Sequence, residues 1–171
     1  MNRSNILIAD EAMKSGGIFT ATHIRNGEII GVDTNHNKVT TEGLIEIGNR
    51  VFSTATQTPF YIALYTGAHT PLASDKAATF SSLASEYTAY NEPARPLYNP
   101  TNIDGLIANT ASKAIFTFAE SVTIRGIAVL TVPAKGATYG VLLSLNSLLA
   151  AKAFTAGDEF AIEYKFQFSA S

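Results

Sequence analysis

The sequence predicts a mainly β protein: an antiparallel β-sandwich of jelly-roll type that carries one α-helix and a short N-terminal arm. Short runs rich in β-branched and aromatic residues recur through the second half of the chain, separated by short polar connections. Residues 40–52 instead carry apolar residues at helical spacing. No repeat of fixed period is present, which disfavours propellers and solenoids.

The composition is that of one folded domain without an obvious cofactor. The chain has 171 residues, 46% hydrophobic and 15% charged, with a formal net charge of -2 and no Cys. The lack of Cys excludes disulfides, thiolate metal sites and cysteine nucleophiles. The slightly acidic balance argues against nucleic acid as a partner. The longest uncharged stretch, residues 136–151, is shorter than the roughly 20 apolar residues of a membrane helix, so no membrane contact is expected.

The N-terminal residues 1–16 are expected to form an arm, and residues 17–171 a single β-sandwich domain. The pair Gly16-Gly17 is expected to act as a flexible step between the two. Too short to form a core alone, the arm is expected to dock on a neighbouring subunit through its apolar run, which consists of Ile6, Leu7 and Ile8.

A β-hairpin is predicted directly after the arm. The β-branched runs 18–25 and 28–32 flank Asn26-Gly27. This dipeptide favours a type I′ turn because both central residues of that turn need a positive φ.

One helix is predicted over residues 40–52. Thr40 or Thr41 can cap its free amides, and Glu42 suits the positive end of the helix dipole. The apolar stripe of Leu44, Ile47 and Val51, with Ile45 and Phe52 beside it, is expected to pack against a sheet.

The other predicted strands follow in order. Residues 59–66 are apolar on both alternating faces, which predicts cover on both sides, and residues 86–90 form a short strand before a long Pro- and Asn-rich loop over 91–105. Further strands are expected at 106–110, 113–119, 122–132, 139–145, 148–154 and 159–168. The last has the clearest period of two, with five large residues on one face: Phe160, Ile162, Tyr164, Phe166 and Phe168.

No motif indicates catalysis or a metal. The three histidines are far apart in the chain, and Asp33-x-Asn35-x-Asn37 resembles only the start of a calcium loop. Serine-nucleophile and phosphate-loop patterns are lacking. Glu92, close to Arg95 in the long loop, is the most interesting acid, with an ion pair or a loop-ordering contact as the simpler interpretation. The protein is therefore expected not to be an enzyme and to need no cofactor.

The candidate partner-binding residues outside the arm lie in and beside the long loop. Tyrosine serves both protein interfaces and sugar stacking. Tyr90, Arg95 and Tyr98 are interleaved with Pro and Asn there, which suggests a recognition surface, with local packing as the alternative.

Four segments resemble a family of small virion proteins of tailed bacteriophages. They are the N-K-V-T-T-E-G-L of residues 37–44, the P-F-Y-I-A-L-Y of 59–65, the E-Y-T-A-Y-N-E-P-A-R-P of 86–96 and the G-D-E-F-A-I-E-Y-K-F of 157–166. The resemblance covers roughly Gly31 to Phe168 and includes no catalytic signature. It implies a capsid decoration or cement protein on the outside of the shell, bound to the major capsid protein and to itself as a homotrimer.

A second class of function is a tail-associated or host-adsorption β-sandwich that binds carbohydrate. Exposed tyrosines near Asn and Asp would then form the site. Glycan-array binding by the isolated protein would favour this class, whereas co-sedimentation with assembled shells would favour decoration.

Overall fold

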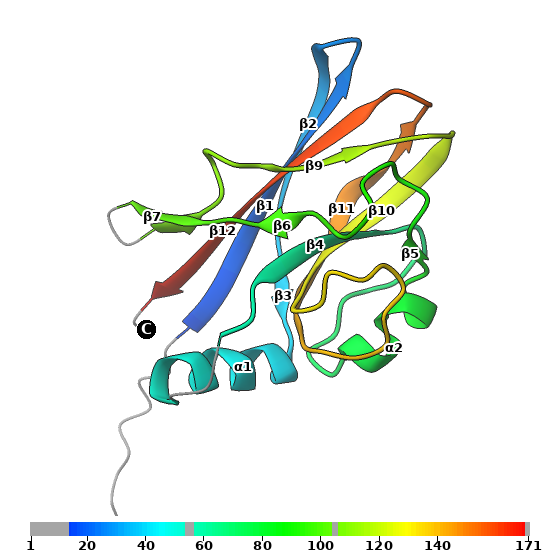
Figure 1. The fold of residues 1–171 in the computed structure, drawn as a ribbon. Coiled ribbons are helices and arrows are strands. Elements are labelled where there is room, and N and C mark those ends of the chain that lie inside the picture. Colours follow the sequence, from blue (N-terminus) through cyan, green and yellow to red (C-terminus); the bar gives the residue numbers. More distant parts are fainter. Residues whose placement is uncertain (1–13, 54–56, 104–105, 170–171) are drawn as a thin grey trace, which may run out of the picture.

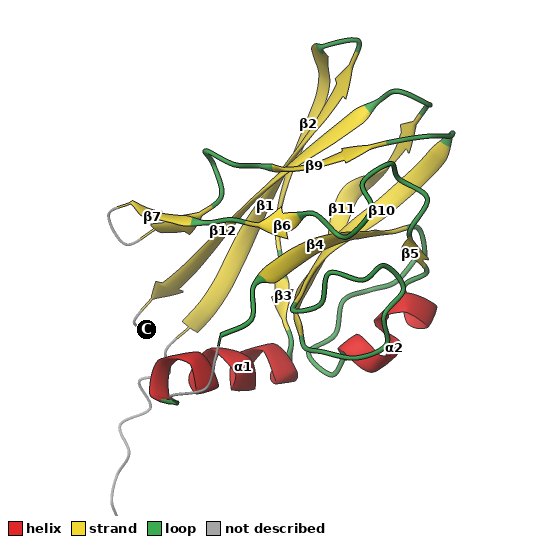
Figure 2. Cartoon of the chain, in the orientation of Figure 1, coloured by secondary structure: helices red, strands yellow, loops and turns green. Residues whose placement is uncertain are grey.

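The computed structural model describes residues 14–53, 57–103 and 106–169, which form two packed sheets with two helices at one end (Figures 1 and 2). The strands of the first sheet are β1 (Lys14–Arg25), β2 (Glu28–His36), β7 (Thr101–Ile103), β8 (Leu106–Ala108), β9 (Ala114–Thr117) and β12 (Glu159–Ser169). The strands of the second sheet are β3 (Lys38–Val39), β4 (Phe60–Tyr65), β5 (Glu86–Tyr87), β6 (Leu97–Tyr98), β10 (Val122–Leu130) and β11 (Leu142–Phe154). The helices are α1 (Thr41–Phe52) and α2 (Ala77–Leu83).

Every pairing between these strands is antiparallel, and the prediction of a β-sandwich is confirmed. The first sheet has the order β2-β1-β12-β8-β7, with β9 also paired to β12. The second has the order β3-β11-β10-β4-β5, with β6 also paired to β4. Exposure alternates along β9 because successive side chains point to opposite faces, whereas β4, β10 and β11 have runs of consecutive buried residues and are covered on both faces there.

The main core lies between the two sheets. The inward face of β12 contributes four side chains as predicted, namely Phe160, Ile162, Tyr164 and Phe166, which are at most 7% exposed. The side chain of Phe168 lies outside the described residues. Across from them the second sheet supplies Ile62, Leu64, Ile127, Val129 and Leu143. This core joins strands distant in sequence.

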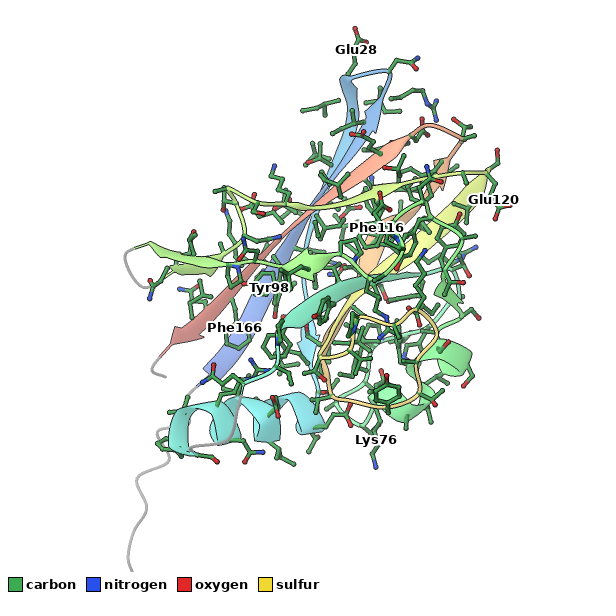
Figure 3. The ribbon with its side chains drawn as sticks, in the orientation of Figure 1. Glu28, Lys76, Tyr98, Phe116, Glu120 and Phe166 are labelled. Atoms are coloured by element: carbon green, nitrogen blue, oxygen red, sulfur yellow. The ribbon has the colours of Figure 1, made fainter. Side chains whose placement is uncertain are left out.

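The predicted hairpin is confirmed. Asn26 and Gly27 join β1 to β2 with φ angles of 51° and 81°. Both values lie in the left-handed region, which glycine adopts freely and asparagine tolerates. The hairpin projects beyond the rest of the sandwich, with Glu28 at its tip (Figure 3).

The prediction that Gly16-Gly17 forms a flexible step is wrong. Both glycines lie within β1, which begins at Lys14, and they pair with Gln167 and Phe166 of β12. The ring of Tyr164 occupies the space where a side chain at position 17 would stand. The lack of a Cβ therefore serves packing here, and the first described residue already belongs to the sheet.

The second helix, α2, was not predicted. It lies in a stretch of small and polar residues, where Ala77, Phe80 and Ala84 stand at helical spacing. These residues form a second core with the outer side chains of β4, Ala63 and Tyr65. The cover expected on both faces of β4 is thus present, and α2 supplies one side of it.

Two other boundaries differ from the sequence prediction. The strands expected at 139–145 and 148–154 are one strand, β11, whose register against β10 jumps between Ser147 and Lys152. The long loop over 91–105 is also partly ordered, because β6 and β7 lie within it. β11 pairs with the preceding strand β10, β7 with the next strand β8, and β6 with the distant strand β4. Local composition does not report where these pairings begin and end.

Candidate functional site

The structure does not form the recognition surface predicted from Tyr90, Arg95 and Tyr98. Their exposed fractions are 4%, 1% and 6%, so all three are buried within the chain. Figure 3 shows Tyr98 between the ribbons. Ile6, Leu7 and Ile8, the candidate residues of the arm, lie outside the described residues.

Arg95 is instead the centre of a buried ion pair. Its guanidinium donates to both carboxylate oxygens of Glu86 at 2.8 Å, and neither side chain is exposed. The third donor of Arg95 bonds the carbonyl of Val132 at 2.9 Å. This bidentate geometry satisfies the charge inside the protein and ties the loop to the end of β10. Arg95 thus has a structural role here.

The two tyrosines are likewise used for packing. Tyr90 stands edge-on to Phe116 and carries the ammonium of Lys135 at 3.8 Å from its ring centroid. Tyr98 contacts the ring of Tyr164, with centroids 5.4 Å apart. Burial raises the pKa of both phenols above the ordinary value of 10.0. They are therefore neutral core residues.

The sequence Asp33-x-Asn35-x-Asn37 does not form a cation loop. Asp33 pairs with Lys152 at 3.5 Å, and the Asn35 amide donates to the carbonyl of Ser147 at 2.8 Å. Asn37 donates to the Tyr164 hydroxyl at 2.8 Å. The three side chains thus have separate partners. Among the residues that the structure describes, no group of three or more His, Asp or Glu side chains could hold a metal ion.

Two histidines form pairs with buried carboxylates. His23 contacts Asp158 at 2.9 Å and His69 contacts Asp75 at 2.8 Å. Arg25 also binds Asp158, through two bonds of 2.7 Å. Each carboxylate also accepts a backbone amide within a turn: Asp158 accepts from Thr155, next to β12, and Asp75 accepts from Leu72. These contacts explain the two histidines as structural residues.

The side chain of Glu92 accepts a hydrogen bond from the backbone. Both of its carboxylate oxygens lie 3.1 Å from the amide nitrogen of Thr117, so this side chain caps the outer edge of β9. The loop-ordering interpretation of Glu92 is thereby confirmed. Arg95, its expected neighbour, pairs with Glu86 instead.

The rotation of α1 is fixed by contacts at its start. The side chain of Thr40 accepts from the amide of Gly43 at 3.0 Å and donates to the carbonyl of Leu142. A Cβ at position 43 would collide with the backbone of Leu143, so only glycine permits this close approach. Glu42 accepts from the amides of Ala77 and Leu142 at 2.7 and 2.6 Å. One face of the helix is therefore held against β11 and α2.

The consequence is that the polar side of α1 faces the protein. Arg50 bonds Glu46 at 2.9 Å, and both side chains are at most 20% exposed. The guanidinium of Arg50 lies 3.9 Å from the ring centroid of Phe60. Ile47 is the one member of the predicted stripe that packs against the core. The expectation that the whole stripe packs on the sheet is wrong.

The other apolar side chains of α1 point to solvent. We call this surface the α1 apolar face, and its exposed fractions are 49% for Leu44, 61% for Ile45, 62% for Val51 and 89% for Phe52. Single exposed apolar residues are ordinary, whereas a group on one element marks an interaction surface. This surface is the strongest candidate functional site on the described part of the chain.

A hollow next to the α1 apolar face is a weaker candidate for a functional site. A shallow hollow of about 420 Å³ lies beside this face, lined by residues that include Thr41, Glu42 and Lys76. Both carboxylates that line it already have partners: Glu42 accepts two backbone amides, and Asp75 pairs with His69. Neither carboxylate is therefore free to select a ligand.

No protein-family model matches the chain, and no curated protein matches it at a significant level. The phage-family resemblance of the four sequence segments is thus a hypothesis. Among the described residues, neither helix has the length and apolar character needed to cross a membrane.

Proposed function

We propose that this protein is a structural component of a tailed-bacteriophage particle, a decoration or cement protein that binds the outside of the shell and stabilises it. The observation that carries the proposal is the α1 apolar face. The resemblance of four sequence segments to small virion proteins supplies the class of partner. On this proposal the major capsid protein covers Leu44, Ile45, Val51 and Phe52.

The four large apolar side chains of the α1 apolar face suit a permanent contact. Complete burial of a large apolar side chain contributes about 1.5–3 kcal/mol, so four such residues supply several kcal/mol per subunit. A particle surface repeats its binding sites, and self-associated subunits would engage several of them at once. Modest single contacts then become tight binding.

The alternative role, carbohydrate binding at the tail, has weaker support. A sugar site of the predicted kind needs exposed tyrosine rings. Tyr87, Tyr90 and Tyr98 are at most 7% exposed and pack in the core. These rings cannot form the stacking platform while the domain is folded.

Co-sedimentation with shells tests the proposal. Empty shells of the encoding phage, prepared without this protein, are mixed with the full chain and pelleted. The wild type is expected to pellet with the shells. The double variant Leu44→Glu/Val51→Glu is expected to remain in the supernatant, because two carboxylates cannot be buried in an apolar contact without a large cost.

A matched control is Leu83→Glu, at a residue of α2 that is 52% exposed. It should bind like the wild type. Wild-type protein that stays in the supernatant contradicts the shell as partner. Equal binding by the double variant contradicts the α1 apolar face as the contact.

A further inference from the structure

The outer edge of β2 has no partner strand among the described residues. β2 is the outermost strand of the first sheet and pairs only with β1. It spans nine residues, Glu28–His36. The outermost strands at the other sheet edges are much shorter: β7 has three residues, and β3 and β5 have two each. Short edge strands protect a protein from pairing with other chains, and β2 lacks this protection.

The register of β1 and β2 shows which backbone groups point outward. The amide of Asn37 donates to the carbonyl of Gly17 at 3.0 Å, and the ladder continues in regular register from there to Gly31. In an antiparallel pair, alternate residues direct both backbone groups to the partner strand. Val32 and Thr34 therefore direct their N–H and C=O groups away from β1.

His36 has the same orientation, but its backbone groups are occupied. Its backbone N–H donates to the side-chain oxygen of Asn35 at 2.8 Å, and its carbonyl accepts from the side-chain amide of Asn146 at 2.7 Å. Side-chain amides thus close the lower end of the edge. The open part of the edge is centred on Val32.

The side chains along this open edge do not oppose association. Ile29, Ile30 and Val32 are 66%, 49% and 57% exposed. Asp33 points inward and pairs with Lys152 at 3.5 Å. The strand has neither the outward lysine nor the proline that blocks edge pairing, and its only irregularity is a bulge near the hairpin tip.

We propose that β2 pairs with β2 of a second copy of this chain, antiparallel and about a two-fold axis at Val32. Identical strands can satisfy each other's backbone in this way, because the outward N–H of each Val32 donates to the outward C=O of the other. Gly31 of each copy then stands opposite Asp33 of the other, and the regular register ends at the bulge that contains Ile30.

The face of the first sheet that carries Val32 continues beyond the contact, and Thr22 and Ala161 on it are only 7% and 3% exposed. Cross-strand partners share one face, and Val32 lies opposite Thr22, Thr22 opposite Ala161, and Ala161 opposite Ile115. Two copies joined at β2 would continue this row of small and β-branched side chains across the axis. The two first sheets then form one continuous sheet.

This geometry differs from the homotrimer that the family resemblance implies. A contact between identical patches closes a two-fold dimer, whereas a trimer needs two different patches that meet head to tail. The proposal does not depend on the shell as a partner. Solution mass therefore distinguishes the dimer from the trimer without a shell.

The first experiment measures mass by light scattering on the full chain at micromolar to 100 µM concentration. Wild type is expected at twice the 18.2 kDa of one chain, and Val32→Lys at the mass of one chain. Leu83→Lys, at a residue of similar exposure on α2, is the control and should remain dimeric. A monomeric or trimeric wild type, or a Val32→Lys variant that stays dimeric, overturns the proposal.

The second experiment does not depend on how the lysine variant folds. The chain has no Cys, so a single introduced cysteine reports one position only. Hydrogen-bonded antiparallel neighbours have Cα atoms about 5.5 Å apart, a separation that a disulfide spans. Under mild oxidation Val32→Cys should form a covalent dimer at least tenfold more than Leu83→Cys. Equal yields from the two variants contradict pairing at Val32.

Discussion

Asp158 binds two side chains and one backbone amide at the turn before β12. Arg25 supplies two hydrogen bonds, His23 one, and the Thr155 amide another. The bonds from Arg25 hold the pKa of Asp158 well below its ordinary value of 3.8, although burial acts in the opposite direction. The carboxylate therefore stabilises the folded state in its ionised form.

This linkage makes the stability of the protein sensitive to acid. A carboxyl whose pKa is lower in the folded than in the unfolded state contributes its full stabilisation above the unfolded pKa. That contribution is lost as the pH falls from about 4 towards the folded pKa. Asp158→Asn should therefore lower the free energy of unfolding at pH 7, because the buried side chain at position 158 then no longer carries the charge that Arg25 and His23 bind.

Urea denaturation at pH 7 and at pH 3 measures this difference. The difference in free energy of unfolding between wild type and Asp158→Asn should be smaller at pH 3. At that pH the wild type loses part of the stabilisation that the ionised Asp158 supplies. Glu120→Gln, at an exposed acid, is the control and should change stability by less than about 0.5 kcal/mol. A gap of equal size at both pH values would contradict the role of Asp158 ionisation.

At the scale of single elements, the β1–β2 hairpin depends on its turn. Gly27 has a φ of 81°, a conformation that a β-branched residue resists. Gly27→Val should destabilise the protein by about 1–2 kcal/mol. Gly16→Val is a matched substitution within β1, where the new Cβ would meet nothing within 4 Å, and it should cost less. Melting temperatures compare the two, and an unchanged value for Gly27→Val would count against the turn.

Successive side chains of β12 lie on opposite faces of the first sheet. Phe166 is 7% exposed in the main core, whereas its neighbour Lys165 lies on the other face and contacts Glu163 at 3.1 Å. Phe166→Ala should cost about 3–5 kcal/mol, and Lys165→Ala less than about 0.5 kcal/mol. Chemical denaturation checks both, and similar costs would contradict the register.

At the scale of the whole molecule, most described charges have partners within the chain. Arg95, Arg25 and Arg50 each bind a carboxylate, and the formal net charge is -2. Contacts with the shell through the α1 apolar face should then depend little on charge. Binding should survive molar salt, where the screening length falls to about 3 Å. Co-sedimentation at low and at molar NaCl measures this, and steep release by salt would refute an apolar contact.

The arm can be removed without shortening the sheet. β1 begins at Lys14, so a chain that starts there keeps every described strand. If Ile6, Leu7 and Ile8 contribute to partner binding, deletion of residues 1–13 should weaken shell binding and leave the melting temperature unchanged. An unaltered affinity for shells would mean that the arm has no part in the contact.

Local patterns in the sequence determined the class of fold and several elements. Period two predicted β12 and its inward face, Asn26-Gly27 predicted the hairpin, and Thr40 with the following apolar spacing predicted α1. Each of these signals comes from neighbouring residues, and the physical cause of each, the strand pleat, the turn dihedrals or the helix cap, acts within a few residues.

The tertiary structure alone decided which surfaces remain free. The close approach of Gly43 to β11 turned Leu44 and Val51 to solvent, although their spacing is that of a helix that packs inward. The ion pair with Glu86 holds Arg95 and its loop in the interior. β2 pairs with β1 on one side, and its other edge has no partner strand among the described residues. Burial depends on contacts between residues far apart in the chain, so no local pattern could have separated the candidate site from the core.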